Sequence, residues 1–145
     1  MSYSIQLHNN LNALSVQHTA LASKFREFAR FIKDCFQTPA VSNHNITASL
    51  QHLDNGYFTT TYANRTISFV FTSLLDDSGN LIGYVQCYIK KEFPEAKQIK
   101  FGEFTFNEEG HTKLKLPNED AEINIADNFG TLHIALHFIR ESLAN

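Results

Sequence analysis

The segment LHIALHFIRESL, near the end of the chain, places His133 and His137 four residues apart. Two imidazoles at this spacing lie on one helix face and can bind a metal ion together. A zinc site needs at least a third protein ligand, and the zincin pattern has Glu directly after its first His. Ile134 occupies that position here, and only His111 or Glu141 could supply the third ligand. His133 and His137 are therefore weak metal candidates.

The alternative is that these histidines flank a buried helix face. On a helical wheel a broad apolar stripe passes beside them, formed by Phe129, Leu132, Ala135, Leu136, Ile139 and Leu143. Ile134 and Phe138 lie on the far side, so the helix has two apolar faces. Such a helix is normally covered on both sides, by the N-terminal helix or by a partner chain. Ile134 and Phe138 are therefore candidate interface residues.

Other catalytic patterns are missing from the sequence. It has no Gly-x-Ser-x-Gly motif and no Gly-rich phosphate loop, and the DDSGN segment (76–80) lacks the spacing of a calcium loop. Cys35 and Cys87 stand alone, which is typical of reduced structural thiols. We expect no catalytic residue, no cofactor and no enzyme activity.

The composition is that of one globular domain, with 145 residues, 43% hydrophobic and 19% charged. A net charge of −3, with both signs interspersed, argues against a nucleic-acid partner. The first residues lack the pattern of a secretion signal, and no apolar run is long enough to span a membrane. We expect a cytoplasmic protein.

Residues 1–36 carry a heptad repeat that predicts a helix about 50 Å long, with Ser2 or Ser4 as its cap. The apolar stripe comprises Leu7, Leu11, Leu14, His18, Leu21, Phe25, Phe28, Ile32 and Cys35. This helix is longer than one sheet needs. Either it breaks near NNLNAL (9–14), or its N-terminal half pairs with a second copy, with His18 fixing the register. We expect a homodimer through Leu7, Leu11, Leu14, His18 and Leu21.

From residue 45 to 126 the apolar pattern changes to a period of two, with turn signals such as DNG (54–56) and DDSGN. This predicts an antiparallel meander of about six strands, with a bulge at Gly102. A helix over 128–144 should pack on one sheet face. The fold class is α+β in a single domain.

The two faces of the predicted sheet differ. Val85, Cys87 and Ile89 alternate with polar or amphipathic neighbours, among them Tyr84, Tyr88 and Lys90. The second set predicts either an ordinary outer face or an open contact surface for another protein.

These patterns favour a non-enzymatic protein-interaction module, of the kind represented by small bacterial cytosolic adaptors, chaperones and immunity-type inhibitors, acting as a homodimer. One alternative is a small-ligand sensor with an aromatic pocket between sheet and helices. A metal-dependent enzyme that uses His133 and His137 is the other.

Overall fold

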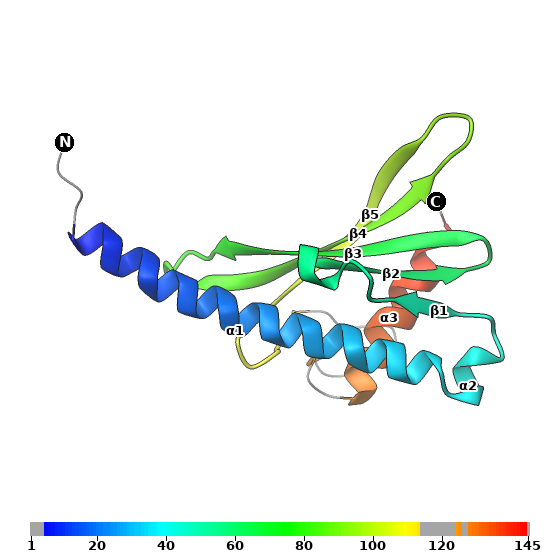
Figure 1. Cartoon of the computed structure of the whole chain (residues 1–145), viewed down its shortest axis with the longest axis horizontal. Helices are drawn as coiled ribbons and strands as arrows, with labels where there is room; N and C mark the ends of the chain where they lie inside the picture. The colour runs from blue at the N-terminus through cyan, green and yellow to red at the C-terminus, as the bar shows by residue number, and fades with distance from the viewer. Residues whose placement is uncertain (1–4, 114–123, 126–127, 145) are drawn as a thin grey trace.

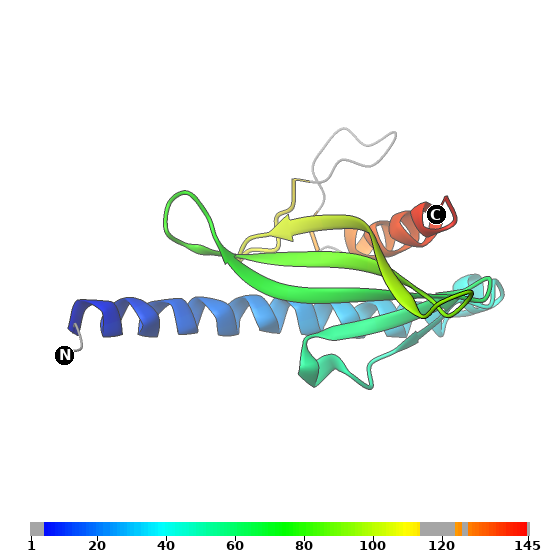
Figure 2. The ribbon, with the colours of Figure 1, turned by 90° about the horizontal axis from the view of Figure 1, so that it is seen from above.

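The computed structural model describes residues 5–113, 124–125 and 128–144. A long helix, α1 (Ile5–Phe36), and a short helix, α2 (Pro39–Ser42), come before the sheet, and α3 (Asn128–Ser142) comes after it (Figure 1). The sheet is an antiparallel meander in the order β1-β2-β3-β4-β5, made of Thr47–Ser49, Tyr57–Tyr62, Arg65–Leu75, Leu81–Lys91 and Lys97–Phe106. Both long helices lie behind one face of this sheet (Figure 2). The predicted α+β class is confirmed.

The described sheet has five strands, and not about six as predicted. The segment expected to form the sixth begins at His111, and its described residues make only isolated bridges, Phe106 with Thr112 and His111 with Asn124. The first strand, β1, is also short and ends at Ser49. Leu53 turns into the core and is 8% exposed, so the chain leaves the strand in a 3-10 turn, Leu53–Asn55.

Helix α1 runs without a break through the NNLNAL segment, and it ends before Pro39 as the sequence predicts. The predicted caps Ser2 and Ser4 lie outside the described residues. At the other end, the Thr38 hydroxyl donates to the Cys35 carbonyl at 2.6 Å, which satisfies one of the last carbonyls of the helix. The buried side chains of α1 all belong to its C-terminal half: Leu21, Phe25, Phe28, Ala29, Ile32 and Phe36.

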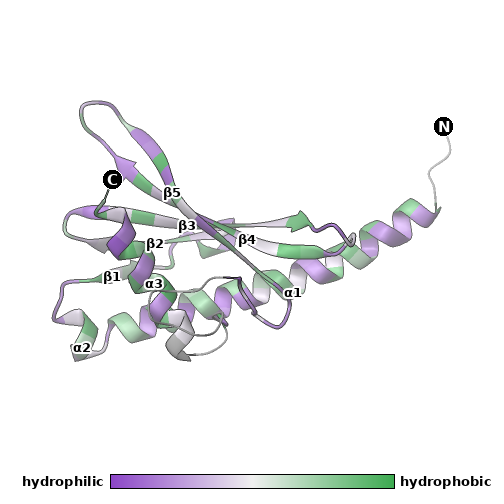
Figure 3. Ribbon diagram, turned by 180° about the vertical axis from the view of Figure 1, so that it is seen from behind, coloured by the Kyte–Doolittle hydropathy of each residue, from purple (hydrophilic) through white to green (hydrophobic). Residues whose placement is uncertain are grey.

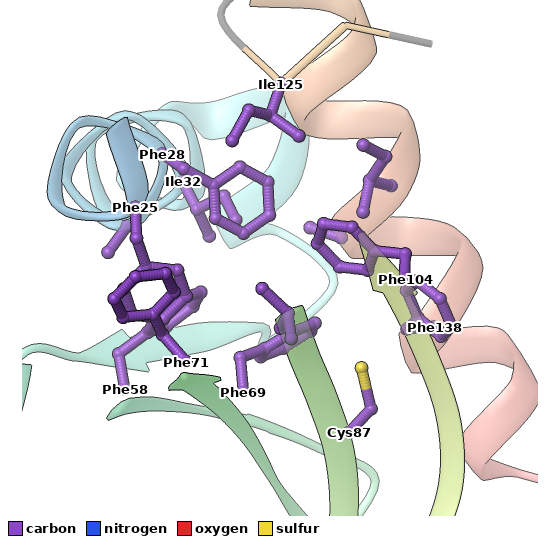
Figure 4. Packing of buried hydrophobic residues seen from close by; sticks show 14 of the residues in the cluster. Phe25, Phe28, Ile32, Phe58, Phe69, Phe71, Cys87, Phe104, Ile125 and Phe138 are labelled. Carbon is purple, nitrogen blue, oxygen red and sulfur yellow. The ribbon is translucent and has the colours of Figure 1, made fainter. Parts of the chain in front are cut away.

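Aromatic rings form the centre of the core (Figure 4). Phe25 of α1 stacks on Phe71 of β3, with ring centroids 5.2 Å apart, and Phe58 stacks on Phe69 at 4.9 Å. Phe138 of α3 also belongs to this cluster. Its ring centroid lies 5.6 Å from that of Phe104 and 6.4 Å from that of Phe69. Such contacts add a preferred geometry to the burial of apolar area. They bind both helices to the same sheet face.

The buried face of α3 differs from the predicted stripe. It consists of Thr131, Ile134, Ala135, Phe138, Ile139 and Ser142. Leu132 and Leu136 are only half-buried, and Leu143 is exposed; the side chain of Phe129 lies outside the described ones. The two buried hydroxyls are satisfied locally, since Thr131 donates to the Ile125 carbonyl and Ser142 to the Ile139 carbonyl. Ile134 and Phe138, which the sequence placed on a second apolar face, therefore lie on the core face of α3, which α1 and the sheet cover.

A bulge in β5 brings the two halves of that strand onto one face, as predicted. Cys87 pairs with Gly102 while Tyr88 pairs with Lys100, so Phe101 is the additional residue. Gly102 also leaves room for α3, because a Cβ at this position would lie 2.7 Å from the ring of Phe138.

We therefore expect Gly102→Ala to lower the free energy of unfolding by about 1–3 kcal/mol, because the added methyl group displaces the Phe138 ring. Urea denaturation followed by circular dichroism measures this cost. In a Phe138→Leu background the same substitution should cost less than half as much, since the smaller side chain can move aside. Equal costs in the two backgrounds would contradict the contact.

Candidate interaction surfaces

The first turns of α1 extend beyond the sheet (Figure 1). We call residues 5–16 the α1 extension; at 1.5 Å per residue it is roughly 18 Å long. Its apolar stripe continues the stripe that is buried further along the helix (Figure 3). Leu7 is 51% exposed and Leu11 is 47% exposed, while Leu14 is half-buried. Val16, on the other side of the helix, is 72% exposed.

The α1 extension also lacks acidic residues, lysine and arginine. Residues 1–23 contain no Asp, Glu, Lys or Arg, and the first charged side chain is Lys24. Surfaces in contact with water are normally rich in charged side chains, whereas the centres of protein interfaces are depleted of them. This absence of charge was readable in the sequence and strengthens the signal of the heptad repeat.

The tip of the β3–β4 hairpin marks the inner end of the α1 extension. The Gln17 side chain accepts a hydrogen bond from the Leu81 backbone N–H at 2.8 Å and donates one to Asn80 Oδ1 at 3.3 Å. A hydrogen bond of 2.6 Å joins His18 Nδ1 to Ser73 Oγ, and the imidazole stacks on Phe71 with centroids 5.7 Å apart. From Gln17 onward, the stripe of α1 therefore faces the chain's own sheet.

This arrangement corrects four of the predicted interface residues. Leu21 and Ile134 are 0% exposed and Phe138 is 4% exposed, so these three belong to the core of the single chain. His18 contacts the hairpin of its own chain, which removes the expected reason for it to fix the register of a dimer. Leu7, Leu11 and Leu14 are the predicted residues that retain exposed or half-buried positions.

Replacing Gln17 with Ala should cost about 1 kcal/mol of stability. It should also speed hydrogen exchange at the Leu81 amide, which loses its acceptor. Gln6→Ala, a matched change at an exposed helix position, should leave that amide unchanged. If the Leu81 amide exchanges at the same rate in both variants, the hairpin is not held by Gln17.

The predicted open-face residues lie on the sheet face opposite α1 and α3. No helix of the described part of the chain covers this face (Figure 2). Tyr84 and Tyr88 are half-buried and Lys90 is exposed. The Tyr84 hydroxyl donates to Glu103, and Lys100 Nζ donates to both, at 2.9 Å to the hydroxyl and 2.6 Å to the carboxylate. These polar groups satisfy one another, as on an ordinary outer face.

The two histidines of α3 lie beside its buried face. This is the position predicted by the alternative in which they flank that face. His133 is exposed, and the half-buried ring of His137 meets Phe138 edge to face, with centroids 5.0 Å apart. Among residues 5–113, 124–125 and 128–144, no group of three or more His, Cys, Asp or Glu side chains is arranged to hold a metal ion.

The aromatic residues between the sheet and the helices offer little surface to a small ligand. A cleft of about 520 Å³ opens where β3 begins and β4 ends, lined by the charged side chains of Arg65, Lys90 and Lys91 and by the exposed Phe93. A smaller cleft, of about 270 Å³, lies where α1 meets the turn before β2. Phe25 and Phe71 contribute to its wall but are 1% and 8% exposed. The buried Phe rings fill the space between helices and sheet.

The two thiols are not activated nucleophiles. Burial raises the pKa of Cys87 far above its usual value, and Lys100 lowers it only in part. Burial, followed by the negative charge of Asp34, raises the pKa of the half-buried Cys35. A raised pKa reduces the thiolate fraction at neutral pH, and the thiolate is the reactive form.

Ellman's reagent at pH 8 should therefore modify Cys35 more slowly than free cysteine, and Cys87 only when the chain is unfolded by denaturant. Comparing Cys35→Ser with the unsubstituted chain assigns the two reactions. Rapid modification of Cys87 in the native state would contradict the burial and the raised pKa.

Comparisons with known proteins leave the function open. No family model matches the chain, and no curated protein or solved structure shows significant similarity to it. None of the described helices is both long enough and apolar enough to cross a membrane.

Proposed function

We propose that this chain is a non-enzymatic protein-interaction module that forms a homodimer through the α1 extension. The observation that carries this proposal is the uncharged, apolar-striped helix end that projects beyond the sheet. An adaptor, chaperone or inhibitor role in the cytoplasm, with a further protein as partner, belongs to the same proposal. The free thiols Cys35 and Cys87 are consistent with a reducing compartment.

The physical basis is the cost of leaving such a helix end in water. An isolated helix of about 12 residues is marginal, because few hydrogen bonds offset the cost of nucleation. The α1 extension is attached to a stable helix, which removes the nucleation cost, but its exposed leucines project beyond the sheet. Burial against another surface contributes about 25 cal/mol per Å² of apolar area. A partner therefore stabilises both the helix and the stripe.

A second copy of the chain suits this surface because the surface is uncharged. In a two-fold dimer each patch faces an identical patch, so a patch with a net charge would repel its copy. The α1 extension has no Asp, Glu, Lys or Arg to repel its copy. A partner recognised by charge would find no complementary group there.

The test is the molar mass of the chain in solution, measured by light scattering after size exclusion. The unsubstituted chain should have the mass of two copies at micromolar concentration. Leu11→Glu should reduce it to one, because the two-fold axis brings two buried carboxylates together, with an expected rise in Kd of about hundredfold or more.

Val16→Glu is the matched control, because Val16 is more exposed than Leu11 and lies about 140° away on the same helix. This variant should keep the mass of two copies. A one-copy mass for the unsubstituted chain would refute the dimer. If Val16→Glu dissociates the dimer and Leu11→Glu does not, the interface lies on the Val16 side of the helix. That result would contradict pairing through the leucine stripe. Circular dichroism should show folded protein in every case.

A further inference from the structure

From the fold we infer how the two copies are oriented: the α1 extensions pair antiparallel, and each N-terminal end lies against the β3–β4 hairpin tip of the other copy. This inference rests on the proposed homodimer. It adds the direction of the helices and a second contact, at Leu75.

The position of the hairpin tip hinders a parallel pair of helices sterically. Two helices paired along their length keep their axes about 8–10 Å apart. In a parallel pair, the second helix would continue beside Gln17 and the residues after it. The hairpin tip already occupies that space, held by the hydrogen bonds from Leu81 to Gln17 and between His18 and Ser73. A parallel partner on the leucine stripe therefore meets the sheet after about three turns.

An antiparallel partner does not meet this obstacle. Its helix runs along the α1 extension in the opposite direction and leaves past Ile5, away from the first sheet. The two-fold axis then crosses the stripe between Leu7 and Leu14. The part available for pairing begins at Ile5 and ends at the hairpin tip, so the overlap is limited to the length of the extension.

The hairpin tip also offers an exposed apolar side chain to an antiparallel partner. Phe71 is buried and Ser73 contacts His18, so the alternation along β3 places Leu75 on the same, helix-facing side. Leu75 is nevertheless 61% exposed. It pairs across the hairpin with Leu81, whose backbone N–H is bound by Gln17. Leu75 thus borders the inner end of the α1 extension, where the first turn of an antiparallel partner would arrive.

This contact also enlarges the interface. Specific protein interfaces generally bury at least about 1,000 Å² in total. Three partly exposed leucines from each copy do not supply that area alone. Leu75 and the surrounding hairpin tip of both copies extend the apolar contact at each end of the helix pair.

Disulfide trapping distinguishes the two orientations. Leu7→Cys and Leu14→Cys chains, each in a Cys35→Ser background, are oxidised separately and as a mixture. One of the two carries a terminal tag, so that the mixed disulfide differs in mass from both homodisulfides. Paired cysteines need Cα atoms about 4.4–6.8 Å apart. The antiparallel arrangement predicts a mixed disulfide that joins one Leu7→Cys chain to one Leu14→Cys chain. It also predicts that Leu14→Cys oxidised alone gives no cross-linked product.

The parallel arrangement predicts the reverse pattern. Each variant oxidised alone would then cross-link efficiently to a second copy of itself, because identical positions face each other across a parallel pair. Efficient cross-linking of this kind in both variants, without the mixed disulfide, would overturn the orientation while leaving the dimer intact.

The hairpin contact has its own matched pair of variants. Leu75→Glu should raise the dimer Kd by about tenfold or more. Leu74→Glu should leave it within about twofold, because Leu74 is 45% exposed but points to the opposite sheet face. Equal effects of the two substitutions contradict the hairpin contact. A one-copy mass for the unsubstituted chain refutes the proposed dimer and the orientation together.

Discussion

The structure depends on a mismatch in length between α1 and the sheet that it covers. The sheet ends at the β3–β4 hairpin tip, which is fixed to α1 by the side chains of Gln17 and His18. On one side of this point the apolar stripe of the helix is buried against aromatic residues of the sheet. On the other side the same stripe continues into solvent, on a helix without charged residues. The boundary between the buried part of the stripe and its solvent-exposed part therefore lies within one continuous helix.

The core explains why the helix is rigid enough to carry its stripe past the sheet. Phe25 and Phe28 of α1 contact Phe58, Phe71 and Phe104 through rings 5.2–6.0 Å apart. Phe138 of α3 completes the layer, in space that Gly102 leaves open. Close-packed interiors resist small displacements, so the position of α1 on the sheet is well determined. A surface presented by such an element loses little conformational freedom when it binds.

Much of this architecture could be predicted from residue periodicity. The heptads of α1, the DDSGN turn and the bulge at Gly102 each follow from local patterns with a direct physical cause. The core face of α3 could not be predicted, because Thr131 and Ser142 are polar and yet buried. Their hydroxyls bind nearby carbonyls, and only the tertiary structure reveals this. The large side chains of Leu132, Leu136 and Leu143 shifted the predicted stripe away from Ile134 and Phe138.

The candidate site was predictable only in part, for a related reason. The exposed leucines follow from the surplus length of the helix, but the point where the surplus begins depends on where the hairpin tip lies. His18 continues the stripe in the sequence, and nothing local indicates that Ser73 binds it. Leu75 likewise gains its position from the β3–β4 register, a long-range property that single-residue patterns do not encode.

In the proposed dimer a second copy of the chain covers the α1 extension. Hydrogen exchange measured over a range of protein concentrations tests it most directly, because it reads the two halves of one helix in the same sample. Amides of residues 6–16 should become more protected as concentration rises through the dimer Kd, while those of residues 21–36 stay constant. Protection of residues 6–16 that does not change between nanomolar and high micromolar concentration would contradict the account.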